Sequence, residues 1–139
     1  MENKLLILSL ILICVSCGSV DTYTSPDYDS GKYTAVSFEQ LLKDPNQFDK
    51  KKIELVGIFH YGMEEAGLTN KKNPKNRIWI EFDYAKKMID KNSKSLFKDE
   101  KLLRYSGKEV KLKGVFNKEN TGHLGIYFAA IEDLHYFGK

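Results

Sequence analysis

Two histidines and a glutamate are the side chains of this chain best suited to chemistry. His60 and Glu64 follow the first predicted strand, and His123 lies in the turn before the last extended stretch. Imidazole and carboxylate groups suit zinc binding or acid–base catalysis. Their spacing, however, matches no His-Glu-x-x-His or comparable ligand motif. We therefore expect no catalytic residue, no metal and no other cofactor, and we keep a hydrolase or metal-binding protein that uses these three residues as the alternative.

Other sequence features exclude further classes of chemistry. The chain has two cysteines, Cys14 and Cys17, and no glycine-rich phosphate loop or Gly-x-Ser-x-Gly elbow. If Cys14 leaves with a signal peptide and Cys17 is acylated, the domain has no thiol for a disulfide, a metal or catalysis. The net charge of +3 is small for a nucleic-acid-binding surface. Nucleic acid is therefore the weakest of the partners considered.

The single tryptophan marks a candidate ligand surface. Arg77-Ile78-Trp79-Ile80-Glu81-Phe82 alternates with the period of a strand. If the apolar residues of this segment face the interior, Trp79 points outward between Arg77 and Glu81. Such a strip is typical of a surface that recognises a polar partner. The competing interpretation is that the 37–44 helix or part of the 84–105 segment covers the ring, because a large ring is normally mostly buried.

A repeated pattern predicts two similar strands. Residues 48–59 and 105–116 share an aromatic residue, a turn, a lysine and then apolar-x-Leu-x-Gly-apolar-Phe. Both copies alternate with period two, so each is expected to be a strand with Gly57 or Gly114 at a bend. The two strands are expected to be neighbours.

The remaining elements complete a mainly β architecture. Ser37 to Gln40 has the layout of a capping box that starts a short helix ending before Pro45. Leu68 lies in a weak second strand, 77–82 forms the third, 84–105 is mostly helical, and 124–137 is the last extended stretch. This order predicts a five-stranded OB-like Greek-key barrel (β-β-β-α-β-β) with a short N-terminal helix. Another small antiparallel barrel or sandwich with a helical insert is the alternative.

The N-terminus has the layout of an export signal. Lys4 precedes an apolar run of about eleven residues that ends at Ser16 and Cys17, which is too short for a spanning helix of ~20 residues. Cys14-Val15-Ser16-Cys17 resembles a bacterial lipobox with Cys14 in place of the usual leucine. Cleavage between Ser16 and Cys17 with acylation of Cys17 is expected. A plain secretory peptide cut near Ser16 or Ser19 and an uncleaved anchor are the alternatives.

The chain is thus divided into a signal peptide (1–16), a lipidated cysteine with a flexible tether (17–34) and an OB-like domain (35–139). Acyl chains on Cys17 would hold the domain to a membrane of the cell envelope. Gly18 follows the cysteine where a retaining aspartate would otherwise stand, so by resemblance to lipoproteins of diderm bacteria the outer membrane is favoured in such an organism.

Residues 35–136 resemble a family of small, mostly secreted bacterial proteins with no assigned activity. The match runs through Leu41-Leu42 with Pro45, residues 52–57, His60 with Glu64 and Leu68, residues 78–82, residues 107–110, 114–117 and 122–125. Thr69 stands where that family usually has tyrosine. The resemblance implies fold and export, and it implies no chemistry. The function expected is a non-enzymatic binding module that engages a protein, peptide or glycan.

Overall fold

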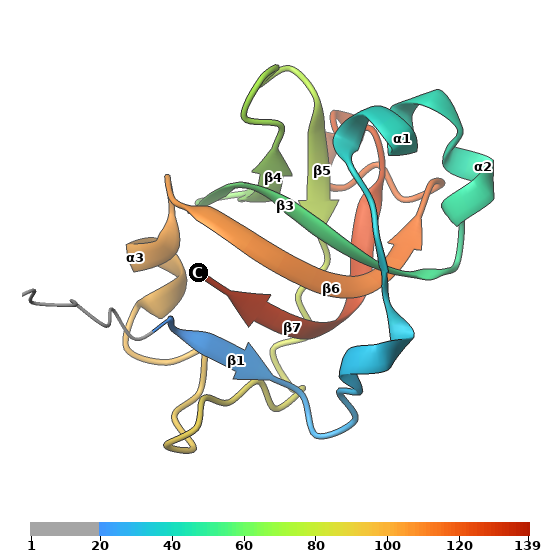
Figure 1. The fold of residues 1–139 in the computed structure, drawn as a ribbon. Coiled ribbons are helices and arrows are strands. Elements are labelled where there is room, and N and C mark those ends of the chain that lie inside the picture. The colour runs from blue at the N-terminus through green and yellow to red at the C-terminus, as the bar shows by residue number, and fades with distance from the viewer. Residues whose placement is uncertain (1–19) are drawn as a thin grey trace, which may run out of the picture.

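The computed structural model describes residues 20–139 (Figure 1). Its strands are β1 (Thr22–Thr24), β2 (Thr34–Ala35), β3 (Lys52–Gly62), β4 (Glu65–Thr69), β5 (Arg77–Ile80), β6 (Glu109–Asn117) and β7 (Ala130–Gly138). Its helices are α1 (Phe38–Lys43), α2 (Pro45–Phe48) and α3 (Lys101–Tyr105), with 3₁₀ turns at Ser30–Lys32 and His123–Gly125. The expected signal peptide with Ser16, and the expected lipidation site at Cys17, lie outside the described residues.

All seven of these strands belong to one sheet, and most of their pairings are antiparallel. β3 pairs with β4 and β6, β4 pairs with β5, and β7 pairs with β1, β5 and β6. Two pairings are parallel, β2 with β3 and β5 with β7. The domain is therefore mainly β with a few short helices, as its alternating sequence predicts.

The two glycine-centred strands are neighbours, as predicted. β3 and β6 pair antiparallel, with Gly57 opposite Val110 and Ile53 opposite Gly114. A β-carbon at Gly57 would lie 2.8 Å from the carbonyl oxygen of Thr69, and one at Gly114 would lie 2.7 Å from that of Glu132. Glycine therefore lets an adjacent strand approach at both positions.

The short first helix forms as its sequence predicts. The Ser37 hydroxyl accepts a hydrogen bond from the Gln40 amide, and the Gln40 side chain accepts one from the Ser37 amide. This capping box starts α1, which buries Phe38 and Leu41 in the core. Pro45 begins the separate helix α2.

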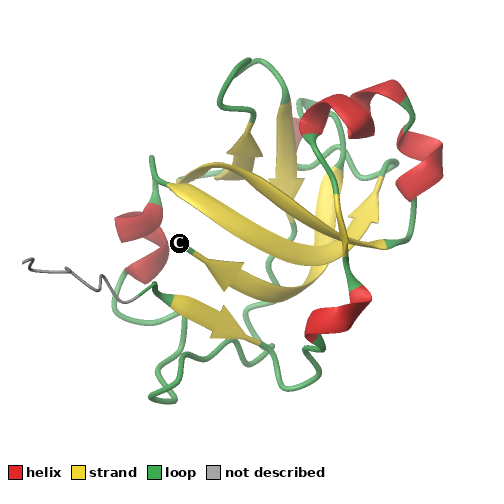
Figure 2. Cartoon of the chain, in the orientation of Figure 1, coloured by secondary structure: helices red, strands yellow, loops and turns green. Residues whose placement is uncertain are grey.

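The prediction that residues 84–105 are mostly helical is wrong. Figure 2 shows the chain between β5 and α3 as loop, and helix is confined to Lys101–Tyr105. The Asp90 side chain accepts hydrogen bonds from the Asn92 and Lys94 amides, and the Ser95 side chain accepts one from the Phe97 amide. These short polar side chains satisfy backbone groups locally and so compete with helix formation.

The N-terminal part of the domain also differs from the prediction of a flexible tether over 17–34. Within its described part, β1 pairs with β7, and the ring of Tyr23 is buried. The Tyr23 and Tyr105 hydroxyls lie 3.1 Å apart. The segment lacks apolar periodicity, but its tyrosines bury large rings and thereby fix it to the sheet.

The last extended stretch is shorter than predicted. It begins at Ala130 rather than Leu124, because a turn and loop occupy residues 123–129. Gly122 and Gly125 have φ values of 65° and 64°. Glycine adopts these positive φ values readily, and the loop that the turn forms lies against the candidate ligand surface.

Candidate functional site

The predicted ligand strip lies on the outer face of β5 and the residue that follows it. Ile78 and Ile80 have no exposed surface, whereas Arg77 and Trp79 are half-buried on the opposite face and Glu81 is exposed. The Trp79 indole Nε1 donates a hydrogen bond to Glu81 Oε2 at 2.8 Å. The predicted alternation is confirmed, and the indole is oriented by a carboxylate.

The loop after β6 covers part of the Trp79 ring. A β-carbon at Gly122 would lie 2.6 Å from Trp79 Cγ, and the ring of Tyr127 packs edge-on against Trp79 at a centroid distance of 5.1 Å. The expectation that the 37–44 helix or part of the 84–105 segment covers the ring is therefore wrong, because the covering residues belong to this loop. Gly122 is suited to its place because it combines a positive φ with close approach to the indole.

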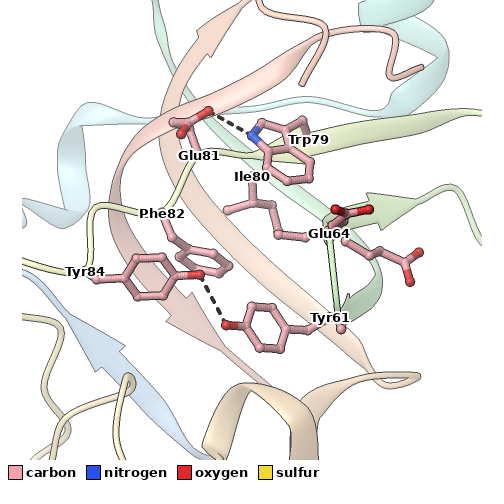
Figure 3. Close-up of a pocket in the computed structure, with 10 residues that line it drawn as sticks. Tyr61, Glu64, Trp79, Ile80, Glu81, Phe82 and Tyr84 are labelled. Carbon is pink, nitrogen blue, oxygen red and sulfur yellow. Dashed lines mark hydrogen bonds between the residues drawn. The ribbon is translucent and has the colours of Figure 1, made fainter. Parts of the chain in front are cut away.

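A hollow of about 150 Å³ opens beside Trp79 (Figure 3). Figure 3 places Trp79 and Glu81 on one side of it and Tyr61, Phe82 and Tyr84 on the other, with Ile80 between them. Its lining comes from β3, β4, β5 and the residues after β5, and comprises Tyr61, Gly62, Glu64, Glu65, Ala66, Trp79, Ile80, Glu81, Phe82 and Tyr84. The hollow thus combines aromatic walls with carboxylates.

Tyr61 and Tyr84 form one wall of this hollow, and their hydroxyl groups are within hydrogen-bond distance of each other. The Tyr61 and Tyr84 hydroxyls lie 3.2 Å apart, and Phe82 packs against both rings. Burial, the hydrogen bond to Tyr61 and the charge of Glu81 raise the pKa of Tyr84 to about 12. The phenol is therefore neutral at physiological pH, so it provides an aromatic face and a hydroxyl and carries no charge.

A second hollow of about 170 Å³ lies beside Tyr127. His60, Thr69, Pro74, Arg77 and Tyr127 are among the residues that line it. The Arg77 guanidinium lies over the Tyr127 ring, 5.3 Å from its centroid. Burial and the charge of Glu65 raise the pKa of Tyr127 against the opposing effect of Arg77. Glu65 lines both hollows, and Arg77 adds a guanidinium to the second one.

The structure separates the three residues proposed for catalysis or metal binding. His60 Nε2 lies 2.9 Å from Thr69 Oγ1, while His123 Nε2 lies 3.6 Å from Glu64 Oε2. In the described part of the chain, no three His, Cys, Asp or Glu side chains come together in a way that could hold a metal. Glu64 and His123 form a pair, and His60 belongs to the second hollow.

Sequence reasoning missed Tyr61, Tyr84 and Tyr127 as parts of the site. A signal existed for two of them, since Tyr61 and Tyr84 each follow a core phenylalanine by two residues, Phe59 and Phe82. In an extended chain this spacing places both rings on one face, within β3 for Tyr61 and past the end of β5 for Tyr84. Tyr127 lies in an irregular loop, where no periodicity indicates its place.

No known protein family, curated protein or solved structure matches this chain. Within residues 20–139, no helix is long and apolar enough to cross a membrane.

Proposed function

We propose that this protein is a lipid-anchored, exported bacterial binding module, without enzymatic activity, that engages a partner through the outer face of β4 and β5. Its partner is a protein, a peptide or a glycan displayed in the cell envelope. The observation that carries the proposal is the open hollow beside Trp79, which has aromatic walls and carboxylates, while no three His, Cys, Asp or Glu side chains of the described residues are placed to hold a metal. Sites of this composition bind and orient a ligand.

We further propose that the sheet is an OB-like Greek-key barrel. Two features support this. Five strands pair in the cyclic order β3-β4-β5-β7-β6-β3, with β5 and β7 parallel. The chain order of these strands, with α3 before β6, is β-β-β-α-β-β. In OB-folds the face of the second and third strands is the usual ligand platform, and here those strands are β4 and β5.

The proposed anchor would hold the domain close to the bilayer. Four residues separate Cys17 from the first strand residue, Thr22. At ~3.5 Å per residue, even a fully extended connection spans less than about 20 Å. The domain would therefore meet partners that lie in or next to the membrane.

Site-specific photo-crosslinking in intact cells tests the binding function. A photoreactive residue at Tyr84, on the rim of the hollow, should give a discrete crosslinked product, and Trp79→Ala should abolish that product. The matched control places the photoreactive residue at Lys43, which is exposed at the end of α1. Identical products from both positions, or products that persist in Trp79→Ala, would contradict the proposal.

The lipid anchor has a separate test. Cys17→Ser should abolish metabolic labelling with a fatty acid and leave the unprocessed precursor. Normal processing of this variant, with a mature start beyond residue 17, would reject lipidation without affecting the proposed binding face.

A further inference from the structure

We infer that the hollow beside Trp79 binds an organic cation, the guanidinium or ammonium group of an arginine or lysine side chain on a partner peptide. This inference rests on the proposed binding function and names the chemical class of the ligand. It follows from the size of the hollow, its aromatic walls and the charge around it.

The size of the hollow fits one side chain. Its volume of about 150 Å³ is below the range of about 300–1,000 Å³ that is usual for sites of drug-sized ligands. The buried side chain of Ile80 lies between its walls. A long aliphatic side chain could lie along this apolar surface while its charged end reaches the carboxylates.

Aromatic rings occupy both walls. Trp79 lies on one side, and Tyr61 and Tyr84 lie on the other (Figure 3). The faces of such rings carry negative electrostatic potential, so they attract cations. Trp79 and Tyr84 remain partly or largely open to solvent, and their rings are accessible to an entering side chain.

The carboxylates around the hollow lack strong cationic partners. Glu64, Glu65 and Glu81 line it, and in the described part of the chain none of them forms a salt bridge to lysine or arginine. The His123 imidazole Nε2 lies 3.6 Å from Glu64 Oε2. The Glu81 carboxylate accepts the Trp79 N–H bond and so is held beside the ring.

Other carboxylates of the described residues, such as Glu39 and Asp83, also form no salt bridge, but these three share one hollow with aromatic rings. Elsewhere Glu54 pairs with Lys111 and Lys113, and Asp133 pairs with Lys86. The chain contains 22 lysines and arginines against 19 acidic residues, so cations are plentiful. Three carboxylates share this hollow, and none of them pairs with a lysine or arginine of the chain. They therefore favour a cation supplied by the partner and disfavour an anionic ligand.

Fluorescence titration tests the ligand class directly, because Trp79 is the only tryptophan of the chain. The mature protein is titrated with acetyl-Ala-Arg-Ala-amide and with acetyl-Ala-Lys-Ala-amide. The control is the corresponding citrulline peptide, which has nearly the shape of the arginine peptide but no charge. Ionic strength is held constant throughout. We expect a saturable change in Trp79 emission with the two cationic peptides and none with citrulline.

Two conservative variants assign the effect to the carboxylates. Glu81→Gln and Glu64→Gln should each weaken binding of the arginine peptide by about tenfold, as expected for loss of a charge-assisted contact. Glu109→Gln is the matched control, because Glu109 is an exposed glutamate on β6 that pairs with Lys71 and does not line the hollow. It should bind like the unchanged protein.

Several outcomes would overturn the inference. Equal binding of the citrulline and arginine peptides would show that charge is not recognised. The absence of any response to the cationic peptides would also reject the inference. The neutral trisaccharide chitotriose is titrated in the same way, and a response to it alone would indicate a glycan ligand instead of a cation. These results leave the proposed function intact if the crosslink at position 84 still depends on Trp79, so the two failures are distinguishable.

Discussion

Tyr127 packs so closely on the backbone of Gly67 that a β-carbon at position 67 would lie 2.9 Å from Cε1 of its ring. Gly67 lies on β4 directly opposite Trp79 on β5. The missing side chain of Gly67 therefore makes the space in which Tyr127 reaches Trp79. Gly67 itself lines the second hollow, and through Tyr127 and Trp79 it also affects the first.

Gly67→Ala is expected to displace Tyr127 and expose Trp79. The added methyl group would also meet the Ile78 carbonyl oxygen at 2.9 Å, so a loss of about 1–3 kcal/mol in the free energy of unfolding is expected from overpacking. Urea denaturation measures this loss, and a red shift of Trp79 emission reports the displaced ring.

Gly62→Ala is the matched control for this substitution. Gly62 ends β3 on the rim of the hollow beside Trp79, and a β-carbon there meets nothing within 4 Å. It should change neither stability nor emission. Equal effects of the two substitutions would show that the contact between residues 67 and 127 does not position the indole.

The strands were readable from sequence because their buried residues alternate. Ile53, Leu55 and Phe59 on β3, and Val110, Leu112 and Phe116 on β6, are all buried. Alternation of buried and solvent-facing side chains is a local pattern that can be recognised in the sequence without knowledge of the tertiary structure. These two strands and their pairing could therefore be predicted, although the start of β7 could not.

Two of the errors arose where long-range contacts decide the structure. The segment after Thr22 looks like a polar linker, yet its tyrosines pack on rings that are distant in sequence, such as Tyr105 and Tyr136. Likewise, Trp79 could be placed on the outer face of a strand, but the loop that covers it lies more than 40 residues away. Single-sequence patterns hold no information on such pairs.

Lys113 fixes the N-terminal segment to the sheet, and Lys113→Met should release it. The ammonium group lies 4.9–5.6 Å from the ring centroids of Tyr28, Tyr33 and Tyr136, donates to the Tyr28 hydroxyl and pairs with Glu54. Burial alone would lower the pKa of Lys113, but the contacts with Tyr28 and Glu54 raise it. Removing this buried cation is expected to cost about 1–3 kcal/mol.

Hydrogen exchange measures the release, and Lys111→Met provides the control. Lys111 also pairs with Glu54, but its side chain is 44% exposed against 11% for Lys113. An exposed pair contributes little, so this variant should lose less than about 1 kcal/mol. Amides of residues 26–36 should exchange faster only in Lys113→Met. Similar exchange in both variants would show that the tyrosine contacts do not hold the segment.

Gly114→Ala should destabilise the junction of β6 and β7. A β-carbon at this position would approach the Glu132 carbonyl oxygen and Ile131 Cγ2, both at 2.7 Å, where the register between the strands shifts. Because backbone cannot rotate away as a side chain can, a loss of about 2 kcal/mol or more is expected. Gly31→Ala, which has its nearest contact at 3.7 Å, is the control. Thermal denaturation of the two variants at one pH decides the matter, and equal midpoints would contradict the close approach.

His135 should make the stability of the fold depend on pH. Its side chain is 1% exposed on β7, and its Nε2 lies 3.1 Å from Asp133 and 3.4 Å from Asp27. Burial and the nearby Lys86 lower the pKa of His135, and they outweigh the two carboxylates, which raise it. The folded protein therefore favours the neutral imidazole.

The direction of the pH effect follows from this lowered pKa. In the unfolded chain the imidazole takes up a proton at its ordinary pKa of about 6.5. Below that pH the unfolded state binds more protons than the folded state. The free energy of unfolding therefore decreases as the pH is lowered, until the pH passes the pKa of His135 in the folded protein. Above about pH 7 His135 contributes no slope.

Urea denaturation of the mature protein between about pH 5 and 8 measures the slope. His135→Gln should flatten it in the range below about pH 6.5, whatever its effect on stability at pH 8. His60→Gln is the matched control, because His60 is half-buried and contacts the Thr69 hydroxyl rather than a charged group. That variant should keep the slope of the unchanged protein. If His135→Gln kept the full slope as well, the pH dependence would arise from other groups, and the buried neutral imidazole would be rejected as its source.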